Sequence, residues 1–154
     1  MSKLKPRFPS LLNRGHPLAQ GLIGCWLFNE RGGAAVYDLS GHKHHGTLTN
    51  MDPSTDWGIG RFGSGLDFDT TDDHIALGNP VGLQITGPLS ISIWLRRDDT
   101  GNSGVCVRDG GATNRGYRLS AETGPTFAFS VAIDASTEAS VSTATQTNGI
   151  WTHI

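Results

Sequence analysis

The chain has 154 residues and a formal net charge of −2 at pH 7. That length suffices for one domain with a substantial core, and the sequence lacks the basic excess of a nucleic-acid-binding protein. Charged residues make up only 17% of the chain, and its 21 glycines are far more than helices tolerate. The composition therefore predicts an all-β protein of short strands and many turns.

The first 20 residues, MSKLKPRFPSLLNRGHPLAQ, indicate an extended arm ahead of the domain at residues 21–154. Prolines and scattered basic residues leave no sustained apolar period. The arm has no apolar core of the length that an export signal needs, and no stretch of the sequence is long enough to cross a bilayer. We expect neither export by a signal peptide nor membrane insertion. The arm is either a loose tail or a segment that docks on a neighbouring domain or subunit.

The first predicted strand is GLIGCWLFNE, residues 21–30, whose apolar residues fall on both faces, as in a strand covered on both sides. Cys25 lies in it, and Cys106 lies in a later predicted strand. We expect two buried free thiols, because neither cysteine stands in a nucleophile-like motif. A disulfide would need the two Cα atoms within about 7 Å of each other.

The next stretch, DLSGHKHHGTLTN at residues 38–50, holds three histidines in four positions: His42, His44 and His45. In an extended chain only His42 and His44 converge, whereas a zinc site needs three or four ligands. The sequence favours solvated loop residues at His42 and His44 over a metal site or a partner contact. His45 is the candidate for a partly buried structural histidine, and Asp38 is expected to cap the following Ser-Gly turn.

Residues 51–60 are rich in Asp, Pro, Ser and Gly and predict a loop. The following GRFGSGLDFDTTDDHIAL, residues 60–77, predicts a hairpin that turns at TTDD. Because Ca²⁺ takes oxygen ligands, Asp67, Asp69 and Asp72 form a candidate calcium site. The alternative is a soluble hairpin with Asx turns.

The clearest strand signal is LSISIWLRR, residues 89–97, which carries Leu and Ile on one face and Ser, Trp94 and Arg96 on the other. A large aromatic residue on a polar face is either covered by a neighbouring strand or loop, which we favour, or binds a ligand. Further strands are expected at residues 105–107, 116–119, 127–133 and 140–145 and at the final GIWTHI. No long helical period occurs, and the pattern favours an antiparallel sandwich over a small barrel.

Taken in order, these stretches resemble the laminin-G-like branch of the concanavalin A-like jelly-roll superfamily. The series runs through GLIGCWLFNE, VYDLSGHKHHGTL, GRFGSGLDFDTTDDHIALG, LSISIWLRR and GIWTHI, over residues 21–154. Its N-terminal half is also similar to phage and environmental proteins of this branch. The resemblance implies a jelly-roll sandwich whose last strands would follow GIWTHI, so we expect an open edge or face that self-associates.

The resemblance also implies a non-catalytic recognition module that binds carbohydrate or a glycoconjugate through aromatic platforms and polar loop side chains. The candidate ligand-binding residues are Trp57, Trp94, Asp72, Asp73 and Asn102. The alternative function is a structural or accessory protein of a phage particle. In that case the arm and the open sheet edge make the subunit contacts.

Glycan hydrolysis is not expected, although the superfamily includes glycanases. Glycoside cleavage uses two carboxylates about 5 to 9.5 Å apart, and retaining members of the superfamily carry acids at alternating positions of one strand. Glu30, Glu122 and Glu138 stand in no such alternation, and the sequence shows no nucleophilic triad or phosphate loop. We predict no enzyme activity and, calcium apart, no cofactor.

Overall fold

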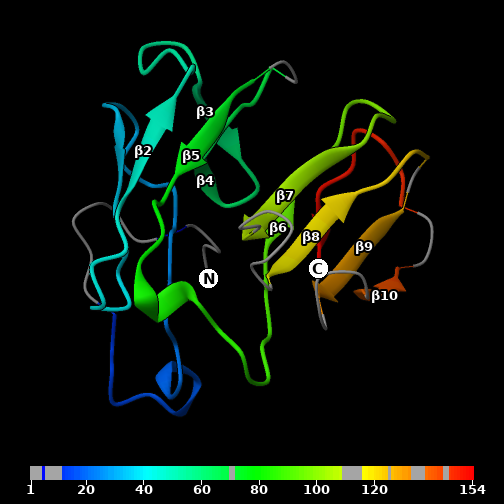
Figure 1. Cartoon of the computed structure of the whole chain (residues 1–154). Coiled ribbons are helices and arrows are strands. Elements are labelled where there is room, and N and C mark those ends of the chain that lie inside the picture. Colours follow the sequence, from blue (N-terminus) through cyan, green and yellow to red (C-terminus); the bar gives the residue numbers. More distant parts are fainter. Residues whose placement is uncertain are drawn as a thin grey trace. The chain divides into compact units, whose positions relative to one another are not determined.

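The computed structural model describes Lys5 and residues 12–69, 72–108, 116–124, 126–132, 138–143 and 146–154. Within these ranges the only helices are two short 3-10 turns, η1 (Pro17–Ala19) and η2 (Val81–Leu83), which confirms the absence of long helices there. The chain forms two compact units that divide between Leu83 and Gln84. Both are built from antiparallel strands (Figure 1), and each is described by itself.

The first unit contains two small antiparallel sheets. One has the strand order β1-β2-β5, with β1 at Ala35–Val36, β2 at Gly46–Thr49 and β5 at His74–Ala76. The other is the hairpin of β3 (Trp57–Gly60) and β4 (Gly63–Leu66). The core of this unit consists of buried Val36, Leu48 and Met51, against which Trp26, Phe28, Trp57, Leu66 and Ile75 pack.

The predicted strand over residues 21–30 is wrong. This segment is described throughout and contributes an isolated bridge, between Trp26 and Asp38, in place of a continuous ladder. Phe28 has a φ of 52° and Arg31 a φ of 67°, both in the left-handed region. A strand needs consecutive residues in the β region, so Phe28 breaks the extended run and Arg31 prevents its continuation.

The predicted hairpin over residues 60–77 is also wrong. β4 pairs with β3, which lies in the segment predicted to be a loop, and β5 pairs with β2. Thr70 and Thr71 of the predicted turn lie outside the described residues. Alternation of apolar and polar residues indicates a strand but does not select its partner, which is why both strands were found and their pairing was not.

The second unit contains a four-stranded antiparallel sheet in the order β10-β9-β8-β7. Its strands are β7 (Ser103–Arg108), β8 (Tyr117–Ala121), β9 (Phe127–Ala132) and β10 (Glu138–Ser142). A second, two-stranded ladder pairs β6 (Trp94–Leu95) with β11 (Thr152–His153). A strand is found in each segment predicted from residue 105 to the end, although in GIWTHI it covers only Thr152–His153. The long strand predicted over residues 89–97 shortens to β6.

The core of the second unit lies on one face of the four-stranded sheet. Leu119, Ala121 and Phe127 are almost fully buried, with exposed fractions of 2%, 1% and 1%. Partly buried side chains from the neighbouring ladder pack against them, among them Ile93 and Leu95. Successive residues of a strand face opposite sides, so Ile93 and Leu95 turn inward and Trp94 between them turns outward.

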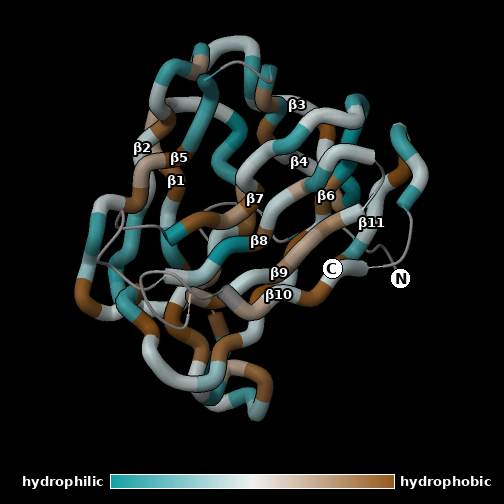
Figure 2. Tube along the Cα trace, turned by 45° about the vertical axis from the view of Figure 1, so that its right-hand side comes forward, coloured by the Kyte–Doolittle hydropathy of each residue, from teal (hydrophilic) through white to brown (hydrophobic). Residues whose placement is uncertain are grey.

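Hydrophobic stretches are short along the whole drawn tube (Figure 2). Among the described residues, no helix has both the length and the apolar character needed to cross a bilayer. This pattern agrees with strands that bury alternate side chains.

Candidate functional site

Asp38 caps the histidine-rich loop, as predicted. Its carboxylate accepts hydrogen bonds from the backbone N–H groups of Cys25 (2.9 Å), Ser40 (2.8 Å) and His44 (3.0 Å), and from the Ser40 hydroxyl (2.7 Å). Burial alone would raise the pKa of this carboxyl. The hydrogen bonds to its charged form outweigh burial, and the pKa lies below the usual value of 3.8. The ionised carboxylate therefore fixes the loop.

The interpretation of the three histidines needs correction. His44, expected in solvent, is only 9% exposed, and its Nδ1 donates a hydrogen bond to the Ile23 carbonyl at 3.0 Å. His42 is exposed and stacks on His44 with ring centroids 5.7 Å apart. His45, expected to be partly buried, is exposed, and its Nδ1 accepts from the Asp38 N–H at 3.0 Å. Contacts within the loop therefore decide which ring is covered.

The carboxylates of the predicted calcium site follow β4 and precede β5. Asp72 Oδ2 accepts from Asn50 Nδ2 at 2.8 Å, and Asp73 Oδ2 accepts from the backbone N–H of Asp69 at 3.0 Å. The Asp67 side chain is exposed. No group of three or more His, Cys, Asp or Glu side chains that could hold a metal ion occurs within the described ranges. Calcium binding here stays a prediction, since residues 70 and 71 lie outside those ranges.

The two cysteines are free, as predicted, and both are half-buried. Burial raises the pKa of the Cys106 thiol, and burial together with the charge of Asp38 raises the pKa of the Cys25 thiol. A raised pKa keeps a thiol protonated at neutral pH, whereas nucleophilic attack needs the thiolate. Both residues therefore act as small apolar side chains.

Arg97 anchors the loops that surround the predicted ligand residue Asn102. Its side chain is only 8% exposed. The guanidinium donates to four carbonyl oxygens, those of Gly101 (2.6 Å), Glu122 (3.2 Å), Gly124 (2.8 Å) and Thr126 (3.4 Å). Asn102 Oδ1 in turn accepts a hydrogen bond from the Thr123 hydroxyl at 2.8 Å. The described structure therefore places Asn102 in a bridge between two loops.

The outward face of β6 and β11 carries exposed aromatic rings. Trp94 and His153 are directly opposite each other in the ladder, and their rings stack with centroids 5.1 Å apart and planes 29° apart. Trp94 is 41% exposed. The neighbouring strand β11 therefore covers part of the Trp94 ring through His153, as expected, and the rest of the side chain is open. The alternative, an aromatic surface open to a ligand, fits the observed exposure.

Polar groups surround this stack. The Ser92 hydroxyl lies 2.8 Å from His153 Nε2, within hydrogen-bonding distance. The Arg96 guanidinium lies 5.9 Å from the centre of the Trp151 ring and forms an ion pair with Asp98 at 2.7 Å. We name the set Ser92, Trp94, Arg96, Trp151 and His153 the β6–β11 platform. Sequence reasoning found Trp94 but missed the aromatic residues of GIWTHI, because their position opposite β6 depends on pairing.

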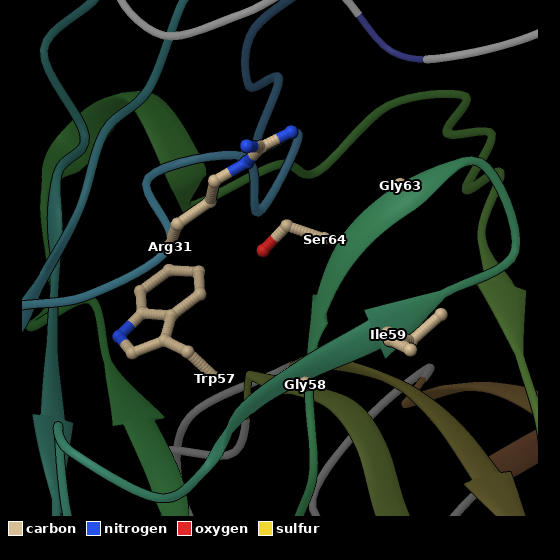
Figure 3. A pocket seen from close by; sticks show the side chains of 6 residues that line it. All are labelled: Arg31, Trp57, Gly58, Ile59, Gly63 and Ser64. Atoms are coloured by element: carbon tan, nitrogen blue, oxygen red, sulfur yellow. The ribbon is translucent and has the colours of Figure 1, made fainter.

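A pocket lies at the β3–β4 hairpin in the first unit (Figure 3). It is a shallow pocket of about 390 Å³, lined by Arg31, Trp57, Gly58, Ile59, Gly63 and Ser64. Trp57, a predicted ligand residue, forms one wall. The predicted ligand residues Asp72 and Asp73 of the same unit do not line it. The sequence signal that was missed is glycine at every second position of WGIG and GSGL.

Two antiparallel units rich in short strands define an all-β protein of the sandwich class. Residues 69–154, more than half of the chain, match the profile of the concanavalin A-like lectin/glucanases superfamily. The chain belongs to this family, which confirms the predicted fold class and the resemblance seen in the sequence.

The fold is also similar to a crystal structure of an S-layer domain-containing protein (residues 221–444) from Clostridium thermocellum ATCC 27405. The TM-score is 0.65, with 24% sequence identity, over 83% of this chain and 60% of that chain. The chain thus spans about 60% of the length of that structure, and the similarity shows the fold alone. A search of curated proteins gave no significant match.

Proposed function

We propose that this chain is a non-catalytic carbohydrate-recognition module whose ligand lies on the β6–β11 platform. The proposal depends chiefly on one observation. Trp94 is 41% exposed, and its indole stacks on the ring of exposed His153. Sugar rings present faces of C–H groups that pack on aromatic rings, while their hydroxyl groups bond to polar side chains at the edge. The platform offers both features on one surface.

The platform is preorganised by the backbone beneath it. Ile93 and Ile154 exchange two backbone hydrogen bonds, at 2.9 and 3.0 Å, next to the Trp94–His153 pair. Rigid aromatic side chains lose little conformational freedom on binding, which favours affinity. The one cation of the platform, Arg96, is already paired with Asp98. We therefore propose a neutral glycan as the ligand.

The family description spans lectins, which bind carbohydrate, and glucanases, which hydrolyse it. Support for a non-catalytic module comes from the described carboxylates. Glu30 Oε1 accepts from the Tyr37 N–H, and Glu122 Oε1 accepts from the Ser120 hydroxyl. Each is engaged in a local hydrogen bond, and neither is a residue of the platform.

The test is a glycan array followed by calorimetric titration of the neutral oligosaccharides that score. We expect Trp94→Ala to weaken binding at least roughly tenfold, as loss of an aromatic anchor does, and Trp94→Phe to weaken it less. Val107→Ala is the matched control, since Val107 is an apolar side chain of the same unit with 50% exposure. Absence of binding to every neutral glycan, or equal affinity for Trp94→Ala and wild type, contradicts the proposal.

The same titration run with Ca²⁺ and with a chelator tests the calcium prediction for Asp67, Asp69 and Asp72. A calcium-dependent affinity that Asp69→Asn abolishes would support that site. If the affinity is the same in both buffers, and if titration of the protein with Ca²⁺ alone releases no heat, the calcium prediction is wrong.

A second candidate function is a structural subunit of a surface layer or of a particle such as a phage. It is favoured by the similar fold of an S-layer domain-containing protein and by exposed Val107 and Val141 on β7 and β10, the edge strands of the described four-stranded sheet. Edge strands pair readily with other chains. Analytical ultracentrifugation of the full chain, of the chain without residues 1–20 and of Val141→Lys tests this second function. A wild-type chain that stays monomeric at all concentrations contradicts it.

A further inference from the structure

The β3–β4 hairpin gathers its side chains on one face. Trp57 pairs with Leu66, and Ile59 pairs with Ser64. The positions between them are all glycine, paired as Gly58 with Gly65 and Gly60 with Gly63, so the opposite face is bare backbone. A Cβ at Gly60 would lie 2.7 Å from the Ser64 carbonyl oxygen, which explains the glycine there. The side-chain face then supplies Trp57, Ile59 and Ser64 to the pocket.

The Trp57 ring is a fixed wall of this pocket. It packs against the core cluster of Val36, Leu48 and Met51, and its indole N–H donates to the Gly33 carbonyl at 2.9 Å. With the indole N–H satisfied, the part of the ring toward the pocket offers an apolar surface. The neighbouring Ile59 is 92% exposed and extends this apolar surface along β3.

Arg31 supplies the only charge among the residues that line the pocket. Its φ of 67° places it in the left-handed region, which is uncommon for a residue with a Cβ. Within the described part of the chain its guanidinium makes no hydrogen bond or ion pair. Figure 3 shows the aliphatic stem of Arg31 beside the Trp57 ring and the guanidinium farther out, beyond Ser64 at the rim of the pocket. Strained backbone of this kind is concentrated at ligand sites. The neighbouring Glu30 instead accepts a hydrogen bond from the Tyr37 N–H at 2.8 Å.

Ser64 adds a hydroxyl to the same space. Its carbonyl accepts a hydrogen bond from Lys5 Nζ at 2.8 Å, which holds this position of β4. Its hydroxyl points toward the side of the pocket where Arg31 and Trp57 lie (Figure 3). A cation, an aromatic wall and a hydroxyl thus converge on one hollow.

We propose that this pocket is a second glycan site, which binds a sugar unit bearing a carboxylate. The guanidinium of Arg31 matches a carboxylate in a planar, two-bond geometry, Trp57 packs on the ring, and Ser64 bonds to a hydroxyl group. The pocket volume of about 390 Å³ lies at the lower end of the roughly 300–1,000 Å³ of small-molecule sites, which suits one or two sugar units. The proposal rests on the proposed function for the class of ligand only, since it uses none of the platform residues.

The test titrates the full chain with trigalacturonic acid and, separately, with its methyl ester, which keeps the shape and removes the charge. We expect binding of the acid alone, weakened by salt. Arg31→Gln should weaken it at least roughly tenfold, in line with loss of a charged anchor, and Ser64→Ala should weaken it less. Arg61→Gln, an exposed arginine at the turn of the same hairpin, is the control and should bind like wild type.

Trp57→Phe is preferred to Trp57→Ala because the indole also packs on the core. A circular dichroism spectrum equal to wild type shows that each variant is folded. Equal affinity for the acid and its ester, or for Arg31→Gln and wild type, overturns the proposal, as does failure of the acid to bind. Trp94→Ala should leave binding of the acid unchanged, so the proposals for the platform and for the pocket are tested independently.

Discussion

The two units of this chain hold their loops in opposite electrostatic ways. In the first unit a carboxylate, Asp38, accepts three backbone N–H bonds and a hydroxyl bond. In the second unit a guanidinium, Arg97, donates to four backbone carbonyl groups. Each side chain supplies hydrogen bonds to backbone groups of the loops beside it, as buried polar groups require.

The difference lies in what surrounds each charge. The strands of the first unit have two to four residues, so its ladders are short and its loops depend on Asp38. The sheet of the second unit has strands of five or six residues, and Arg97 joins the loops at its end. Acid can neutralise a carboxylate, whereas a guanidinium stays charged. The two units should therefore respond differently to substitution and to pH.

The largest effect is expected from Arg97→Met, which removes one donor from each of four carbonyl groups. The Thr126 carbonyl still accepts a hydrogen bond from the Glu122 N–H. The free energy of unfolding should fall by about 3 kcal/mol, the upper range for hydrogen bonds to a charged group. Urea unfolding followed by tryptophan fluorescence measures the change. Hydrogen exchange near Gly101 and Gly124 localises it.

The neighbouring Arg96 provides the matched control, because it is 41% exposed and pairs with Asp98 at the surface. Arg96→Met should lower the free energy of unfolding by no more than about 1 kcal/mol. Equal losses for Arg96→Met and Arg97→Met would mean that Arg97 is not an anchor.

Asp38→Asn should have the next largest effect, a loss of about 2 kcal/mol in the free energy of unfolding. The amide keeps the size of the side chain but loses the charge and turns one acceptor into a donor. Hydrogen exchange at Cys25, Ser40 and His44 should accelerate. Asp52→Asn is the control, since Asp52 makes the same two bonds to Ser54, at 2.8 and 2.6 Å, on the exposed surface. Its substitution should change stability far less, and the reverse order would contradict this interpretation.

Gly82→Ala should cost about 1 kcal/mol or more, because a Cβ there would lie 2.8 Å from His44 Cε1 and Nε2. The ring cannot move freely, since it bonds to the Ile23 carbonyl. Gly32→Ala, with open space around the added carbon, should stay within about 0.5 kcal/mol of wild type. Equal stability of the two variants would show that the His44 ring adapts.

The smallest change in the free energy of unfolding is expected from lowering the pH. Asp38 has a pKa below its usual 3.8 in the folded chain, so the unfolded state binds a proton more readily. The contribution of Asp38 to stability is complete above its pKa in the unfolded state. It is lost as the pH falls through its pKa in the folded state. Urea unfolding between about pH 5 and pH 2 should therefore show a loss for wild type that is smaller in Asp38→Asn. Protection from exchange, taken relative to the intrinsic rate at each pH, should change less near Gly101 and Gly124, held by Arg97, than at Ser40. The opposite pattern would contradict the comparison.

Part of the fold followed from local pattern. Alternation between an apolar and a polar face predicted β7, β8 and β9, because each of these strands places side chains in the core. Pattern failed over residues 21–30, where apolar residues suggested a strand and left-handed residues such as Phe28 interrupt it. It also failed to separate His44 from His45, because burial of one ring depends on the Ile23 carbonyl.

The sequence by itself determined the all-β class, the family, the Asp38 cap and the outward direction of Trp94. Only the tertiary structure decided that His153 stacks on Trp94 and that Arg31 and Ser64 share a pocket with Trp57. Alternation along a strand sets which face a side chain takes, because the backbone is pleated. Which side chains meet across strands depends on partner and register, and those are set when the whole chain packs.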